Sequence, residues 1–203
     1  MKQIKTVAFF GSSKGDQGDP NFDAAQETAK AVAEMGITVA NGGGPGVMRA
    51  ATIGAKEGNG KTEVVYYNPV YATDFEGASN INMADKQYDE NNYIERTRKL
   101  LELGDAYIIF NGGTGTISEF GMAWGLAKLY FGHHKPLILY GEFWHEIIEG
   151  FQKNMRIGEE ELKVLTIVTK PEDVSEAILK YDEILAKIKD NPKKHDSESR
   201  LFL

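Results

Sequence analysis

Cysteine is absent from this chain of 203 residues, which excludes disulfide bonds and metal sites built on thiolates. No apolar run approaches the roughly 18 residues of a membrane-spanning helix. The first residues, MKQIK, lead directly into a predicted strand rather than into the apolar region of a signal peptide. From these absences we expect a soluble, cytoplasmic protein without a membrane partner.

An excess of basic residues is missing as well. The 23 lysines and arginines are outnumbered by 30 acidic residues, and the formal net charge is −7. Because non-specific binding to nucleic acid requires a basic face, nucleic acid is not an expected partner. A phosphate group bound here must therefore be held by a local arrangement of donors.

Glycine, in contrast, is frequent, with 22 residues that cluster in turns after predicted strands. The fractions of hydrophobic residues, 41%, and of charged residues, 26%, are those of a globular protein. The length predicts one domain over residues 1–189, followed by a polar tail, 190–203, that we expect to be flexible.

Short apolar runs alternate with helical segments, which is typical of a parallel sheet covered by helices. The predicted strands are Thr6–Phe10, Ile37–Ala40, Thr62–Tyr67, Ala106–Phe110, Pro136–Tyr140 and Val164–Val168. The predicted helices are Pro20–Met35, Val47–Glu57, Tyr93–Leu103, Thr116–Phe131, Phe143–Asn154 and Pro171–Lys189. Residues 68–89 have weak periodicity and are predicted to form a long connection. The expected fold is α/β: a Rossmann-like, doubly wound parallel sheet with helices on both faces.

Three loops directly follow predicted strands: residues 11–13, 41–46 and 111–116. The carboxyl ends of parallel strands share one edge of the sheet, where ligands bind in such folds. Each loop precedes a helix, whose free N–H groups favour an anion. A glycine turn alone is equally well explained by a tight connection, but two long ones together indicate a phosphate site.

Two familiar phosphate-binding motifs are absent from these loops. No Gly-Lys-Ser/Thr follows at the Walker spacing, and Tyr66-Tyr67-Asn68 stands where a dinucleotide-binding chain would carry an acidic residue. An NAD-dependent dehydrogenase is therefore not expected.

Residues 111–119 read NGGTGTISE, and residues 42–48 read GGGPGVM. The first segment resembles the P-G-G-x-G-T-x-x-E motif, and the second the G-G-G-x-x-G-L-M turn, of the LOG family of cytokinin-activating phosphoribohydrolases. Residues 95–100, ERTRKL, followed by GDA at 104–106, are similar to its arginine-bearing helix and next strand, and FGSS at 10–13 to its opening loop. The resemblance extends over about residues 5–170.

The resemblance implies a Rossmann-like homodimer that needs neither cofactor nor metal. It implies hydrolysis of the N-glycosidic bond of a nucleoside 5′-monophosphate, either a cytokinin riboside monophosphate or an AMP-like one, to free base and ribose 5-phosphate. The catalytic candidates are Glu119, which would stabilise positive charge on the ribose and orient water, and Arg96, which would clamp phosphate or base. The substrate-binding candidates are Gly11, Ser12, Ser13, Gly43, Gly44, Arg98, Lys99, Gly112, Gly113, Thr114, Gly115 and Thr116.

Two positions depart from the family pattern: Asn111 replaces the motif proline, and Thr97 stands where lysine usually follows the arginine. Counting back from Asp105 without a gap places Arg96 on the family's arginine, and this is the alignment we favour. A slip of two residues would place Arg98 and Lys99 on the Arg-Lys pair instead. The alternative interpretations are a solvated helical charge for Arg96 and a carboxylate at a helix N-terminus for Glu119.

Other functions were weighed against hydrolysis. A non-catalytic nucleotide-binding protein, such as one related to molybdenum-cofactor carriers, would share the glycine turns. An amino-acid decarboxylase is disfavoured, because no lysine lies in a convincing pyridoxal-binding context. His133 and His134 do not indicate a metal site, because adjacent side chains point apart and no carboxylate cluster follows. Trp124, Tyr130 and Phe131 are interpreted as core or dimer contacts.

Overall fold

The computed structural model describes residues 2–69, 77 and 84–189. The predicted flexible tail, 190–203, and most of the connection predicted after residue 68 lie outside these residues.

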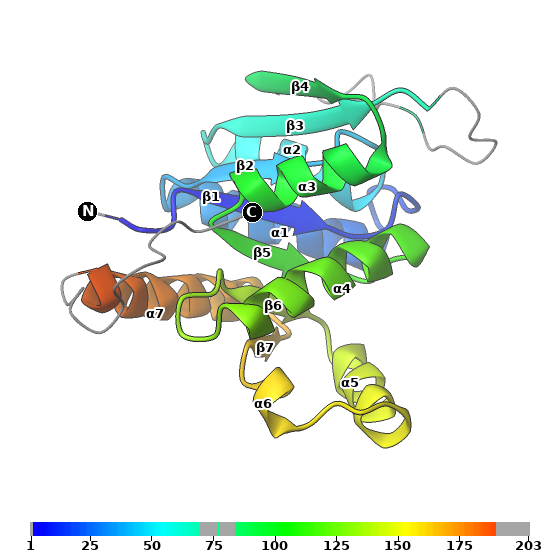
Figure 1. Ribbon diagram of the computed structural model, residues 1–203. Helices are drawn as coiled ribbons and strands as arrows, with labels where there is room; N and C mark the ends of the chain where they lie inside the picture. The colour runs from blue at the N-terminus through cyan, green and yellow to red at the C-terminus, as the bar shows by residue number, and fades with distance from the viewer. Residues whose placement is uncertain (1, 70–76, 78–83, 190–203) are drawn as a thin grey trace.

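Seven parallel strands form one sheet in the order β4-β3-β2-β1-β5-β6-β7 (Figure 1). The strands are β1 (Thr6–Phe10), β2 (Thr38–Asn41), β3 (Thr62–Tyr67), β4 (Lys86–Glu90), β5 (Ala106–Ile109), β6 (Leu137–Tyr140) and β7 (Leu165–Val168). The chain builds outward from β1 to β4, then returns to the other side of β1 and builds outward again to β7. This order confirms the predicted doubly wound, Rossmann-like α/β fold.

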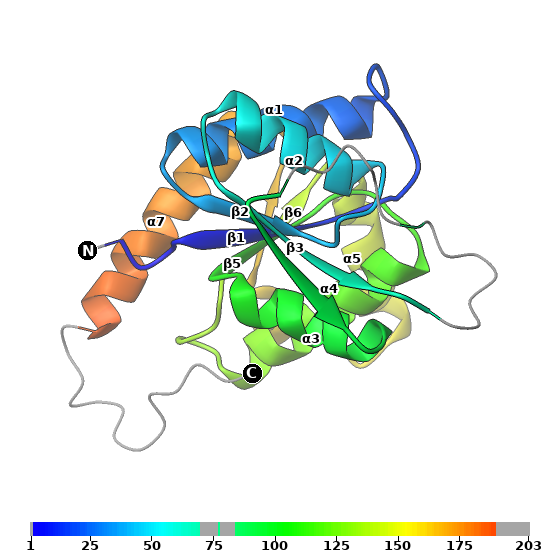
Figure 2. The ribbon, with the colours of Figure 1, turned by 90° about the horizontal axis from the view of Figure 1, so that it is seen from above.

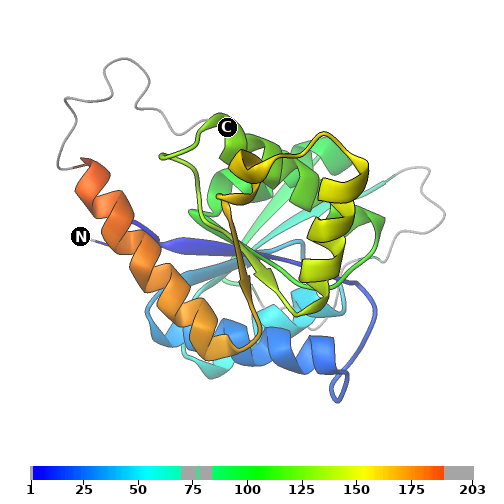
Figure 3. The same ribbon diagram turned by 90° about the horizontal axis from the view of Figure 1, so that it is seen from below.

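Helices cover both faces of the sheet, as Figures 2 and 3 show from opposite sides. One face carries α1 (Pro20–Glu34), α2 (Val47–Glu57) and α7 (Pro171–Lys189), and the other carries α3 (Tyr93–Leu103), α4 (Thr114–Leu129) and α5 (Phe143–Asn154). A short helix, α6 (Glu159–Leu162), precedes β7. In the part of the chain that the structure describes, no helix has the length and apolar character to cross a membrane.

The central strands are mostly apolar because the sheet is buried on both faces. In β1, Val7 and Phe9 belong to the core under α1, α2 and α7, whereas Ala8 and Phe10 belong to the core under α3, α4 and α5. Successive side chains of a strand point to opposite faces, so one short strand contributes to both cores.

The ends of α1 follow the predicted signals. The Asp19 carboxylate accepts hydrogen bonds from the N–H groups of Asn21 and Phe22, Pro20 is the first helical residue, and Gly36 follows the end of the helix with a φ of 74°. The start of this helix is thereby fixed beside the loop that follows β1.

The prediction of an irregular connection over residues 68–89 is wrong at its end, where β4 pairs with β3. Its sequence, KQYDE, is polar because β4 is an edge strand with mostly exposed or half-buried side chains. Helix α6 was also missed. Helix α4 begins at Thr114, two residues earlier than predicted, which places Glu119 in its second turn rather than its first.

The sheet order creates a switch point between β1 and β5. These neighbouring strands lead into helices on opposite faces, so their loops diverge and leave a crevice at the carboxyl edge. The loops beginning at Gly11 and Asn111 both start at this crevice.

Candidate functional site

The three predicted loops come together at the carboxyl edge of the sheet. The Ser12 N–H donates to the Asn111 carbonyl at 2.9 Å, and the Val47 N–H donates to the Ser12 carbonyl at 2.9 Å. The loop after β1 therefore lies between the other two and is hydrogen-bonded to both sides.

Glycine is required where these loops touch. Gly46 has a φ of +63°, and a Cβ there would lie 2.2 Å from the Ser12 carbonyl oxygen. A Cβ on Gly112 would lie 2.1 Å from Thr116 Oγ1 and 2.9 Å from the Ser12 nitrogen. Contacts this short exclude any side chain, so these two glycines permit the close approach of the loops.

The turn after β2 is mostly closed to ligands. Gly43 and Gly44 are buried, and the Gly43 N–H donates to the Asn41 side-chain oxygen at 2.8 Å. The Tyr66 ring occupies the place that a Cβ on Gly43 would need. Gly43 thus has a packing role in this structure, and its amide is already engaged.

The turn after β5 is open. Gly113, Thr114 and Gly115 are exposed, and Gly113 caps α4 without any side-chain hydrogen bond to the first helical N–H groups. A Cβ on Gly113 would meet no atom of the described residues within 4 Å. Internal packing therefore does not explain this glycine, whereas close approach of a ligand to an uncapped helix N-terminus would.

Arg96 is buried beneath the loops, with only 5% of its surface exposed. Its Nε donates to the Val65 carbonyl at 3.1 Å and its Nη2 to the Gly42 carbonyl at 3.0 Å, while the guanidinium carbon lies 5.7 Å from the centre of the Tyr67 ring. These two hydrogen bonds of its guanidinium go to neutral carbonyl groups, and a phosphate could approach it. Because Arg96 is buried, the alternative of a solvated charge does not fit.

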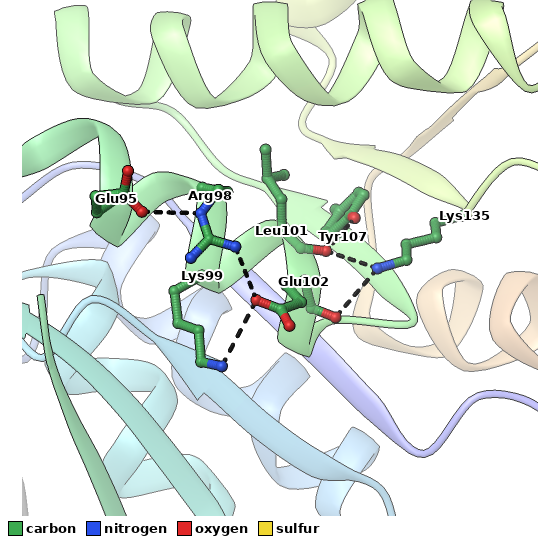
Figure 4. Close-up of polar contacts among 7 residues, drawn as sticks. All are labelled: Glu95, Arg98, Lys99, Leu101, Glu102, Tyr107 and Lys135. Atoms are coloured by element: carbon green, nitrogen blue, oxygen red, sulfur yellow. Dashed lines mark hydrogen bonds and ion pairs between the residues drawn. The ribbon is translucent and has the colours of Figure 1, made fainter. Parts of the chain in front are cut away.

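Arg98 and Lys99 lie elsewhere on α3 (Figure 4). Arg98 pairs with Glu95 at 2.9 Å and with Glu102 at 3.2 Å, and Lys99 lies 3.6 Å from Glu102. Residues two apart on a helix face different directions, so Arg98 is exposed while Arg96 is inward. The structure does not bring Arg98 and Lys99 to the glycine turns.

Glu119 is buried in the second turn of α4, and Tyr93 of α3 contacts the first turns of that helix. The Tyr93 hydroxyl donates to the Gly115 carbonyl at 3.2 Å and contacts the Ser118 hydroxyl. Burial raises the pKa of Tyr93, the negative charge of Glu119 raises this pKa further, and the charge of Arg96 lowers it. The charges of both candidate catalytic side chains thus affect the same hydroxyl group, in opposite directions.

Two aromatic residues of this region, Tyr93 and Tyr67, are not among the candidates that the sequence indicates. Tyr93 and Tyr67 are half-buried, with ring centres 6.1 Å apart and planes at 71°. The only available signals were the unusual Tyr66-Tyr67 pair at the end of a strand and the position of Tyr93 one helical turn before Arg96.

A cavity of about 490 Å³ adjoins two of these loops. Its lining residues are Ser12, Lys14, Gly15, Asp19, Pro20, Asn21, Ala24, Asn111, Tyr140, Gly141 and Phe143. It meets the predicted site at Ser12 and Asn111 but includes neither Arg96 nor Glu119. Because its charged side chains, Lys14 and Asp19, are exposed, we place the chemistry at the buried pair instead.

Within residues 2–69, 77 and 84–189 there is no group of three His, Asp or Glu side chains that could hold a metal. His133 and His134 lie between α4 and β6, as expected for a connection. The His134 ring stacks on Phe131 at 5.8 Å, and burial lowers its pKa.

Residues 30–178, most of the chain, match the sequence profile of a family described as "Possible lysine decarboxylase". The chain belongs to this family, the LOG family. Among curated proteins, none matches this LOG-family chain significantly.

Solved structures share the fold of this LOG-family protein. The molybdenum cofactor binding protein of Rippkaea orientalis is similar with a TM-score of 0.64 and 22% identity, over 88% of this chain and 98% of the other. The molybdenum cofactor carrier protein of Chlamydomonas reinhardtii has a TM-score of 0.63 and 18% identity, over 91% and 99%. DNA processing protein A of Helicobacter pylori has a TM-score of 0.58 and 17% identity, over 88% and 82%. At these identities the likeness is one of fold.

Proposed function

We propose that this LOG-family protein hydrolyses the N-glycosidic bond of a nucleoside 5′-monophosphate, releasing free base and ribose 5-phosphate. The observation that supports it most is that two buried side chains of opposite charge lie on the elements that frame the glycine turns. Arg96 is hydrogen-bonded to the Gly42 carbonyl, and Glu119 lies one turn beyond the uncapped start of α4. Perturbed or buried charged groups next to a ligand loop mark candidate active sites.

The phosphate of this substrate would bind at the turn after β5. The N–H groups of Thr114, Gly115 and Thr116 begin α4, and the positive end of a helix favours an anion. The Thr114 hydroxyl adds a donor from an exposed position. Gly11, Ser12 and Ser13 would border the same phosphate from the neighbouring loop.

The chemistry would depend on Glu119. As the C1′–N bond breaks, its electron pair leaves with the base and positive charge develops on the ribose, where a carboxylate beneath the ring stabilises it. The same carboxylate can orient the water whose oxygen bonds to C1′ and accept the proton that this water loses, while the released base takes up a proton from solvent. Arg96 would stabilise the negative charge of phosphate or leaving base through its planar guanidinium.

The direct test is chromatography of free base after incubation with AMP, N6-substituted AMP and the other nucleoside monophosphates. Release of base together with ribose 5-phosphate supports the proposal. No release from any of them, with nucleotide binding retained, would contradict it.

The second candidate is a non-catalytic nucleotide or cofactor carrier. Its support is the pair of molybdenum-cofactor proteins that share the fold over nearly their whole length. In that case calorimetry would show binding of a pterin or nucleotide phosphate, and Glu119→Ala would leave this binding unchanged.

Lysine decarboxylation, named in the family description, is not supported by the described lysines. A pyridoxal enzyme needs a lysine free to form a Schiff base in the site. Lys99 pairs with Glu102, and Lys14 is exposed. Lys135 precedes β6, so it lies at the opposite edge of the sheet, where its Nζ donates to the carbonyl of Leu101 at 2.7 Å.

We further propose that a second copy of the chain packs on α4. Its outer side exposes Ile117, Met122 and Leu129, and Tyr130 and Phe131 follow its end. At Gly121 and Gly125 an added Cβ would meet nothing within 4 Å, so a partner helix could approach closely. An isologous dimer would place this interface next to the turn at which α4 begins.

A further inference from the structure

Helix α3 is hydrogen-bonded to both glycine turns of the site. Arg96 donates to the Gly42 carbonyl of the turn after β2, and Tyr93, one helical turn earlier, donates to the Gly115 carbonyl at the start of α4. Two side chains of one helix thus connect the loops that follow two different strands.

Tyr93 is fixed at both ends. Its backbone begins α3, where the Asn92 side chain accepts the Glu95 N–H at 3.0 Å. Its ring packs against Tyr67, and its hydroxyl contacts Ser118, which itself donates to the Gly115 carbonyl at 2.9 Å. A half-buried ring held in this way has little freedom to move away from α4.

The hydroxyl remains a donor at neutral pH, because burial and the charge of Glu119 both favour its protonated form. Loss of this hydrogen bond would leave the first turn of α4 without its tie to α3. Glu119 lies one turn further along α4, so its carboxylate would shift relative to Arg96.

We propose that Tyr93 is a positioning residue, which sets the placement of Glu119 relative to Arg96 by tying the first turn of α4 to α3. This inference rests on the proposed hydrolysis. The side chain would act through α4 rather than through contact with the base or ribose.

The test compares Tyr93→Phe, which keeps the ring and removes the hydroxyl, with Tyr88→Phe. Tyr88 is the matched control because its hydroxyl also donates a hydrogen bond, to Glu63 at 3.0 Å, but at the β3–β4 edge. For Tyr93→Phe we expect kcat to fall about tenfold and KM to rise only about threefold, since misplacement by a fraction of an ångström costs turnover more than binding. Tyr88→Phe should retain the wild-type kcat.

A double variant distinguishes positioning from direct contact. On a Glu119→Gln background, Tyr93→Phe should lower the residual kcat no further, because the group that it positions is already inactive. Two results would overturn the inference. One is that Tyr93→Phe lowers kcat by the same factor in Glu119→Gln as in the wild-type protein, and the other is that Tyr93→Phe alone keeps the wild-type kcat. Should Tyr93→Phe fail to fold, Ser118→Ala replaces it, with an expected loss of about threefold.

Failure of the proposed hydrolysis can be distinguished from failure of the Tyr93 inference, because in the first case the wild-type protein itself releases no base. Titration calorimetry with ribose 5-phosphate then tests Tyr93. We expect its affinity to fall about threefold or more in Tyr93→Phe, because the α4 turn is no longer held, and unchanged affinity would overturn the inference.

Discussion

The Arg96 guanidinium donates a hydrogen bond to the Gly42 carbonyl at 3.0 Å from a position almost fully removed from solvent. A Cβ on Gly42 would lie 1.7 Å from the same guanidinium nitrogen. The turn after β2 therefore serves to hold an arginine in place, and this explains why a glycine-rich turn can be buried and still belong to a site.

Replacement of Arg96 by lysine tests this role. Lysine cannot donate to the Val65 and Gly42 carbonyls in the fixed geometry of the guanidinium, so kcat/KM for the best monophosphate should fall about 100-fold or more. Arg98→Lys is the matched control, since Arg98 forms only exposed ion pairs, and it should stay within about twofold of wild type. Equal losses in the two variants would contradict the assignment of Arg96.

Gly113 offers a test of the phosphate site that is separate from folding. Because a Cβ at this position meets no atom within 4 Å in the part of the chain that the structure describes, Gly113→Ala should leave the melting temperature nearly unchanged. It should weaken binding of ribose 5-phosphate about tenfold in calorimetry if a phosphoryl group lies against this backbone. Gly150→Ala in α5, where space is also open, is the control and should not affect binding.

Most of the sheet could be predicted from the sequence because its central strands are buried on both faces. Such strands are continuous apolar runs, as in Thr6–Phe10, whereas the edge strand Lys86–Glu90 has no such pattern and was missed. The order of strands and loops also predicted which edge of the sheet the candidate site occupies.

The interior of the site was less predictable. Only the phase of α3 separates the buried Arg96 from the exposed Arg98, and the local sequence ERTRKL leaves both alignments open. Gly43 packs on Tyr66, whereas the described residues leave the space around Gly113 open. This difference depends on how distant segments pack, which the local sequence does not show. The hydrogen bond from Tyr93 to Gly115 spans 22 residues and has no local signal.

The proposed dimer predicts a change in mass rather than in fold. Leu129 is 78% exposed at the end of α4, and Leu129→Glu should convert a dimer to a monomer in light scattering after size exclusion. Leu179→Glu, on an exposed leucine of α7, is the control and should leave the mass unchanged. A wild-type monomer at micromolar concentration would refute the dimer.

Stability should decline in alkali. Burial raises the pKa of Tyr107, whose hydroxyl donates to the Leu101 carbonyl at 2.6 Å, so the folded state favours the neutral phenol. This stabilisation is complete below the pKa of an unfolded tyrosine, about 10, and is lost as the pH rises toward the folded value. We expect the free energy of unfolding, measured with urea, to fall from about pH 10 upward.

In Tyr107→Phe the free energy of unfolding should fall less steeply above about pH 10 than in wild type. At neutral pH it should be lower than in wild type by about 1 kcal/mol, because a hydrogen bond is lost. Tyr130→Phe, at a partly exposed position, is the control and should keep the wild-type slope. If the free energy of unfolding falls with pH equally steeply in Tyr107→Phe and in wild type, the Tyr107 phenol is not the cause of the pH dependence.

The most direct test of the catalytic account is the rate of base release from a nucleoside 5′-monophosphate by wild type, Glu119→Gln and Glu102→Gln at equal concentration. Glu119→Gln keeps the size of the buried side chain and removes its charge, whereas Glu102 forms exposed ion pairs on α3. The account predicts a loss of about 100-fold or more for Glu119→Gln and a rate near wild type for Glu102→Gln. Wild-type turnover in Glu119→Gln would contradict it.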